Sequence, residues 1–109
     1  MPAKTIRPED IDSLREAIEG GECTLLDVRE RAEFEAGHIP LAVLIPLSEV
    51  AGRAGELDKG RTIVVYCRTQ GRSGRCAEML SRMGFQDVYV LEGGFTRWKD
   101  RQRAGAGER

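Results

Sequence analysis

The sequence predicts an α/β domain with three layers, in which helices cover a central, mainly parallel sheet of about five strands. Short apolar segments rich in β-branched residues alternate along the chain with segments of helical periodicity. Strands that alternate with helices pair in parallel through right-handed crossovers. The 109 residues are 40% hydrophobic and 32% charged, and residues 1–100 contain no internal repeat or linker. This composition suits one folded domain over residues 1–100.

Strands are expected where β-branched and apolar residues cluster, at residues 4–6, 24–28, 42–45, 61–66 and 87–91. The first helix is expected to open at Pro8 and to stop at Gly20, as helix boundaries commonly do. Ser48 is expected to cap a short helix that reaches residue 51. The remaining helices are expected at residues 31–36, 72–82 and 95–101. Residues 101–109 are polar and lack apolar anchors, which predicts a frayed tail.

Composition also excludes several classes of function. The formal net charge of −1 gives no overall attraction to nucleic acid or to an anionic membrane. No apolar run approaches the roughly 20 residues that span a bilayer, and Met1 begins no signal peptide. Three widely spaced cysteines indicate a reducing compartment, so we expect a cytoplasmic protein. One histidine and no Cys-x-x-Cys pair argue against zinc, and we expect a monomer without a cofactor.

Cys67 is the candidate nucleophile. The expected strand ends at Tyr66 and the next helix begins near Arg72, so Cys67 lies in a short loop that leads into a helix N-terminus. Backbone N–H groups have no intrahelical partner there, and the helix dipole adds positive potential. Arg68 and Arg72 flank the sulfur. Each factor stabilises a thiolate over a thiol, which predicts a nucleophile that meets anionic substrates.

Several segments together resemble the rhodanese (thiosulfate sulfurtransferase) family. The first is the strand, the cysteine and six further residues that end in Arg72-Ser73, followed by a helix. The others follow the family's order along residues 4–100: Leu25-Leu26-Asp27-Val28-Arg29-Glu30, Glu33-Phe34, Gly37-His38-Ile39-Pro40, Ile45-Pro46-Leu47, and Val90-Leu91-Glu92-Gly93-Gly94-Phe95 with Trp98.

The chain departs from the family pattern at two positions. Gln70 stands where the family commonly has glycine, and Gly71 comes one residue later. If that position requires a positive φ, Gln is disfavoured there by about 1–2 kcal/mol, which affects loop geometry and turnover. Leu41 stands where the family often has glycine after Ile-Pro, and we expect it to change only a surface turn.

The resemblance implies sulfur transfer through a persulfide on Cys67. The thiolate would attack the outer sulfur of an anionic donor such as thiosulfate, and a nucleophilic acceptor (cyanide, a thiol or a protein) would then take that sulfur. The loop amides of residues 69–73 would cradle the terminal sulfur. The expected substrate-binding residues are Arg68, Thr69, Gln70, Gly71, Arg72 and Ser73, with Arg72 holding the anionic end of the donor.

Other residues whose side chains could take part in catalysis are expected to have structural roles. Cys76 shares a helical stripe with apolar residues, which predicts core packing, and Cys23 receives no role. His38 lies in a turn, where we expect a satisfied hydrogen bond. Asp27 and Arg29 are expected to form an ion pair or backbone hydrogen bonds near the top edge of the sheet.

Two alternatives stay open. A phosphatase or arsenate reductase of the same fold places five residues between cysteine and arginine, whereas four separate Cys67 from Arg72, which makes a ring better suited to one sulfur than to a phosphoryl group. Alternatively, the domain is a non-catalytic persulfide carrier or docking module. It would then load sulfur and release it quickly only to a partner protein.

Overall fold

The predicted α/β fold is confirmed by the computed structural model, which describes residues 4–107. One sheet holds five strands in the order β1-β5-β4-β2-β3, and every neighbouring pair is parallel. The strands are β1 (Lys4–Ile6), β2 (Cys23–Asp27), β3 (Val43–Leu44), β4 (Thr62–Tyr66) and β5 (Val88–Leu91). Each follows the expected segment to within two residues at either end, because β-branched apolar runs mark buried parallel strands well.

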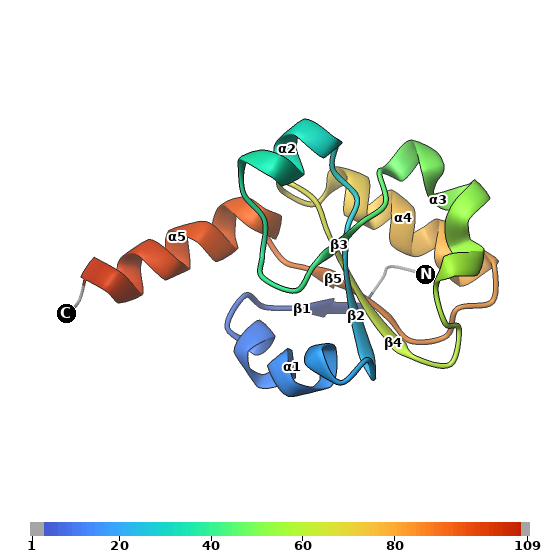
Figure 1. Cartoon of the computed structure of the whole chain (residues 1–109), viewed down its shortest axis with the longest axis horizontal. Helices are drawn as coiled ribbons and strands as arrows, with labels where there is room; N and C mark the ends of the chain where they lie inside the picture. Colours follow the sequence, from blue (N-terminus) through green and yellow to red (C-terminus); the bar gives the residue numbers. More distant parts are fainter. Residues whose placement is uncertain (1–3, 108–109) are drawn as a thin grey trace.

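The helices connect these strands as the alternation predicts. They are α1 (Asp10–Glu19), α2 (Arg31–Ala36), α3 (Leu47–Arg53), the 3₁₀ turn η1 (Ala54–Glu56), α4 (Gly71–Arg82) and α5 (Gly94–Gly107). Figure 1 shows α1 on the lower side of the sheet, α3 and α4 on the upper side, and α5 projecting from the body. None of the helices between residues 4 and 107 is long and apolar enough to cross a membrane.

The central strand β4 supplies side chains to both cores. Ile63 and Val65 point into the core that α3 and α4 cover. Val64 and Tyr66 point into the core on the side of α1 and the first turns of α5. Because side chains alternate along a strand, the residue after Tyr66 returns to the α4 side. Cys67 is therefore directed into the core beside α4, where it is found.

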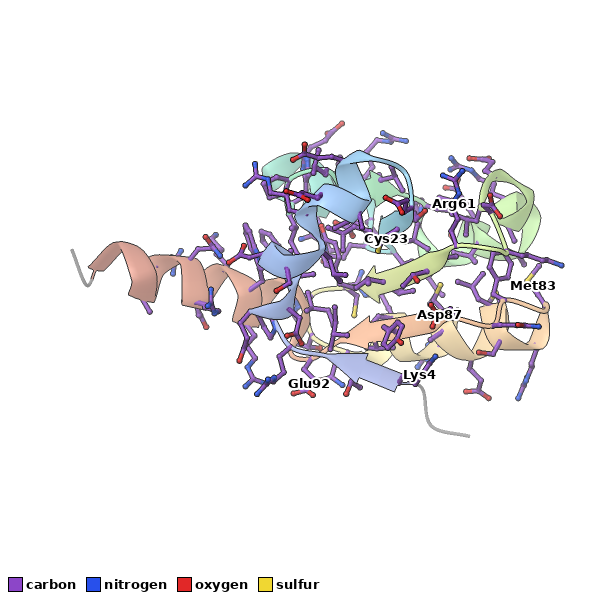
Figure 2. The ribbon with its side chains drawn as sticks, turned by 90° about the horizontal axis from the view of Figure 1, so that it is seen from below. Lys4, Cys23, Arg61, Met83, Asp87 and Glu92 are labelled. Carbon is purple, nitrogen blue, oxygen red and sulfur yellow. The ribbon has the colours of Figure 1, made fainter. Side chains whose placement is uncertain are left out.

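The end of the sheet where the strands begin and the end where they finish hold different groups of residues. Figure 2 shows Lys4 and Asp87 at the end where the strands begin, and Glu92 at the end where β5 has finished. At the first end, Asp87 accepts hydrogen bonds from Lys4 Nζ at 2.9 Å and from Thr62 Oγ1 at 2.6 Å. Cys67 follows β4 and so lies at the other end, where ligands of parallel sheets bind.

Two local expectations differ from the structure. Helix α3 begins at Leu47 after an N-cap at Pro46, so Ser48 lies inside the first turn instead of capping the helix. Helix α5 continues past Arg101 to Gly107, whereas a frayed tail was expected over residues 101–109. Extending a helix that is already formed fixes one residue for each new hydrogen bond, which needs no apolar anchor. Residues 108–109 lie outside the described part of the chain.

Candidate active site

Cys67 lies at the base of the loop between β4 and α4, with only 1% of its surface exposed. The Ser73 N–H donates a hydrogen bond to Cys67 Sγ at 3.4 Å, and Sγ lies 3.4 Å from Ser73 Oγ. Ser73 Oγ in turn donates to the Gln70 carbonyl at 3.2 Å, and Ser73 is fully buried. The first turn of α4 thus directs a backbone N–H at the sulfur, while the Ser73 hydroxyl oxygen accepts from Cys67 Sγ. The position of the cysteine before a helix N-terminus agrees with the expectation from the sequence.

The carbonyl groups of the loop face the start of α5. Phe95 N–H donates to the Cys67 carbonyl at 2.8 Å, and Thr96 N–H donates to the Arg68 carbonyl at 3.1 Å. Gly94 lies directly against this loop, since an added Cβ would overlap the carbonyl oxygens of Cys67 and Thr69. Its φ of +59° also favours glycine. Three consecutive carbonyls of the loop therefore point toward the N-terminus of α5.

This orientation decides where the loop amides point. In a trans peptide the N–H points opposite to the preceding C=O, and no cis peptide occurs between residues 4 and 107. With the carbonyls of residues 67–69 directed at α5, the N–H groups of residues 68–70 face the opposite side of the loop. Within residues 4–107, the N–H groups of residues 68–72 have no hydrogen-bond acceptor. A run of free amides of this kind can bind negative charge.

Gln70 ties the loop to the turn before α5. Its Oε1 accepts a hydrogen bond from Gly93 N–H at 2.8 Å. Its φ is −143°, so this position does not require the left-handed conformation considered from the sequence. The residue that does adopt a positive φ is Leu41, at 74°, the other position where the family often has glycine. The backbone strain lies at that surface turn and not in the cysteine loop.

Arg72 is engaged by an acidic residue of α2. Its Nη1 lies 2.6 Å from Glu33 Oε1 and its Nη2 lies 2.9 Å from Glu33 Oε2. These hydrogen bonds from Arg72 lower the pKa of Glu33 to about 2, and those to Glu33 raise the pKa of Arg72. Arg68, Thr69, Gln70 and Gly71 are exposed in the loop that follows Cys67. Of the six predicted binding residues, Ser73 is the one whose hydrogen bonds with Cys67 Sγ are seen within residues 4–107.

A buried ion pair supports this end of the sheet, as expected. Arg29 donates to both carboxylate oxygens of Asp27, at 2.8 to 3.1 Å, and to the Gly37 carbonyl at 2.7 Å. Its guanidinium lies 4.4 Å from the centre of the Phe95 ring. Tyr66 accepts a hydrogen bond from Ile39 N–H at 3.1 Å, and burial raises the pKa of its phenol. The pair thereby joins β2, the turn after α2 and the start of α5.

The other candidate nucleophiles and ligands lie outside the loop. Cys76 is fully buried in the α4 core, where burial raises the pKa of its thiol to about 12. Burial also raises the pKa of Cys23. His38 stacks on Phe34, with ring centres 3.7 Å apart, and its Nδ1 lies 3.0 Å from the Phe34 carbonyl. Among the described residues, no three His, Cys, Asp or Glu side chains cluster as metal ligands.

Comparison with known proteins agrees with this geometry. A family model described as Rhodanese-like domain matches residues 10–101, which is most of the chain. The chain belongs to the rhodanese-like domain family. Thiosulfate sulfurtransferase GlpE of Pseudomonas syringae pv. syringae (strain B728a) is 38% identical over 96 residues, which cover 88% of this chain and 87% of GlpE. A rhodanese-related protein of Thermoplasma volcanium superposes with a TM-score of 0.77 at 32% identity, covering 90% of this chain and 92% of that one.

Other relatives are longer than this rhodanese-like domain. YqhL of Bacillus subtilis (strain 168) is 42% identical over 80 residues, which cover 73% of this chain and 64% of YqhL. A relative from the same organism, named "Putative sulfur carrier protein YrkF", is 34% identical over 97 residues, which cover 88% of this chain and 52% of YrkF. The chain therefore spans between half and two thirds of the length of these two relatives.

Sequence reasoning missed two residues that shape the loop. The sequence places Glu33 only within the family pattern and does not predict its ion pair with Arg72. A signal was available, because an arginine in the first turn of a helix is electrostatically unfavourable and calls for an acidic partner. Gly94 belonged to a recognised Gly-Gly segment, but nothing in the sequence tells which part of the chain that segment contacts.

Proposed function

We propose that this domain is a sulfurtransferase that carries a sulfane sulfur on Cys67, from a donor such as thiosulfate to a thiol or cyanide. The orientation of the loop carbonyls carries the proposal, since it leaves the amides of residues 68–70 free on the side away from α5. Ser73 N–H already contacts Sγ from the end of the same loop. A persulfide extends Sγ by one negatively charged atom, which such a ring of amides is suited to hold.

The proposed reaction has two steps. In the first, the Cys67 thiolate attacks the outer sulfur of thiosulfate, a new S–S bond forms, and sulfite departs with the electron pair of the broken bond. In the second, an acceptor thiolate or cyanide attacks the terminal sulfur and returns Cys67 as a thiolate. Arg68 and Arg72 would bind the anionic end of the donor. No general base is needed if the attacking sulfur is already ionised.

Intact-protein mass spectrometry tests the first step. After incubation with thiosulfate and removal of excess donor, the protein is expected to gain one sulfur atom. The Cys67→Ala variant should gain none, while Cys23→Ala, which keeps Cys67 and removes a thiol at the other end of the sheet, should gain one. A wild-type protein that remains unmodified by thiosulfate and by organic persulfides would contradict the proposal.

A sulfur carrier is the second candidate, because the relative YrkF bears that name. Transfer rates separate the two roles. An enzyme should release sulfur to cyanide with steady turnover, whereas a carrier should load once and transfer rapidly only to a protein thiol. The cytoplasmic location and the monomeric state remain predictions.

A phosphatase is a weaker candidate. Only four residues separate Cys67 from Arg72. Hydrolysis of an aryl phosphate that is lost in Cys67→Ala would reverse this ranking.

A further inference from the structure

Glu33 is held firmly beside the cysteine loop. Its Oε1 accepts from Arg72 Nη1 at 2.6 Å and from Glu30 N–H at 3.0 Å, and its Oε2 accepts from Arg72 Nη2 at 2.9 Å. The bond to Glu30 belongs to a capping box at the start of α2, which fixes the carboxylate independently of Arg72. Both side chains of the ion pair are 31% exposed. The pair thus lies at the surface, and Arg72 directly precedes Ser73, whose N–H contacts Cys67 Sγ.

The pair changes the charge that a donor meets. The pKa of Glu33 is lowered to about 2 by its hydrogen bonds from Arg72, so its carboxylate remains negative throughout the neutral range. The charge of Arg72 is compensated, and its two terminal nitrogens are occupied. Arg68 is exposed and has no ion-pair partner within residues 4–107. An anionic donor therefore finds one uncompensated arginine and must share the other with a carboxylate.

We infer that Glu33 is a specificity-determining residue that disfavours donors with two negative charges and favours organic sulfane-sulfur compounds with one. The inference rests on the proposed sulfur transfer through Cys67. Thiosulfate carries one charge on the SO3 group next to the transferred sulfur and a second charge shared with that sulfur, and the Glu33 carboxylate repels each of them. An organic persulfide or thiosulfonate carries one charge fewer at that place. Glu33 acts through Arg72 and through its own charge, and it takes no part in bond making.

Two donors that differ by one charge test the inference. Methanethiosulfonate has a methyl group where thiosulfate has a charged oxygen, and both deliver a sulfane sulfur to a thiolate. The measurement is kcat/KM for each donor, at low ionic strength, with cyanide as acceptor. Coulomb repulsion at roughly 7 Å changes affinity by about threefold per charge in bulk water and by about fiftyfold at the lower effective dielectric constant of a protein surface. At low ionic strength, Glu33→Gln should therefore raise the thiosulfate to methanethiosulfonate ratio by a factor of roughly three to fifty.

Matched variants separate charge from structure. Glutamine at position 33 can still form the capping box, so Glu33→Gln removes charge with little change in shape. Glu35→Gln removes an exposed charge from the same helix and should leave the ratio unchanged. Glu33→Asp keeps the charge but shortens the side chain, and it should stay near the wild-type ratio. If Glu33→Gln does not fold, Glu33→Met provides the neutral side chain of similar length.

The outcomes are distinct. A purely structural Glu33 would lower kcat/KM for both donors equally in Glu33→Gln, and an unchanged ratio overturns the inference. An equal shift of the ratio in Glu33→Asp and Glu33→Gln also overturns it, because geometry would then matter and charge would not. If the wild-type protein gains no sulfur from either donor, it is the proposed function that fails.

Discussion

Replacing Gly94 by alanine is expected to displace the cysteine loop. The new Cβ would overlap the carbonyl oxygens of Cys67 and Thr69 and lie 2.8 Å from that of Arg68. All three are backbone atoms, so relief requires that the loop move away from α5. The hydrogen bonds from Phe95 N–H and Thr96 N–H would then lengthen or break.

The cost can be worked out from these contacts. A left-handed φ of +59° costs an alanine about 1–2 kcal/mol relative to glycine. Two weakened backbone hydrogen bonds add about 1 kcal/mol each. We therefore expect Gly94→Ala to lower the free energy of unfolding by roughly 3–4 kcal/mol. Because the amides opposite the carbonyls move with the loop, the rate of sulfur loading should fall by roughly a hundredfold.

Urea unfolding followed by the fluorescence of Trp98, the single tryptophan of the chain, measures the first effect. Mass spectrometry after timed exposure to thiosulfate measures the second. Gly52→Ala is the control, because Gly52 lies in α3 with nothing within 4 Å of an added Cβ, and a helical alanine is up to about 1 kcal/mol better. A Gly94→Ala variant that loses less than 1 kcal/mol and loads sulfur at the wild-type rate would refute the reasoning.

Four further predictions concern single positions. Leu41→Gly should raise the free energy of unfolding by about 0.5–1 kcal/mol, since glycine relieves a φ of 74°, and a urea titration that shows no gain would contradict this. Arg29→Met should lower the free energy of unfolding by about 3–5 kcal/mol, because the Asp27 carboxylate would stay buried without its partner. A urea titration of this variant measures the loss. Glu33 has its pKa lowered to about 2, so its contribution to stability is fully present above pH 4.5 and is lost as the pH falls toward 2. The stability difference between wild type and Glu33→Gln should shrink over that interval in acid titrations. Burial raises the pKa of Cys76 to about 12, so iodoacetamide at pH 8 should modify this residue only after unfolding, as peptide mass spectrometry would show.

Local patterns made much of the fold and the nucleophile predictable. The β-branched run before Cys67 and the helical spacing after it are features of adjacent residues, so they place the cysteine at the carboxyl end of a strand without knowledge of the rest of the molecule. The same holds for Asp27 and Arg29, which are two residues apart and were expected to pair.

Contacts between residues far apart in the sequence were harder to predict. Glu33 and Arg72 are separated by 39 positions, and Gln70 and Gly93 by 23, so their contacts depend on how α2 and the turn before α5 pack around the loop. The strained φ of Leu41 could not be predicted from the sequence for another reason. A positive φ depends on the path of the chain through its turn, and the side chain at that position does not reveal that path.

The hydrogen bonds from the start of α5 to the cysteine loop affect when that loop can form during synthesis. The cysteine loop takes its shape from the N–H groups of Phe95 and Thr96, which follow it in the chain. On the ribosome, β4 and Cys67 emerge before the segment that orients the loop carbonyls. Until residues 93–96 have been synthesised and have docked, the nascent chain contains Cys67 without the hydrogen bonds that orient its loop, so the loop can take this shape only after the start of α5 is in place.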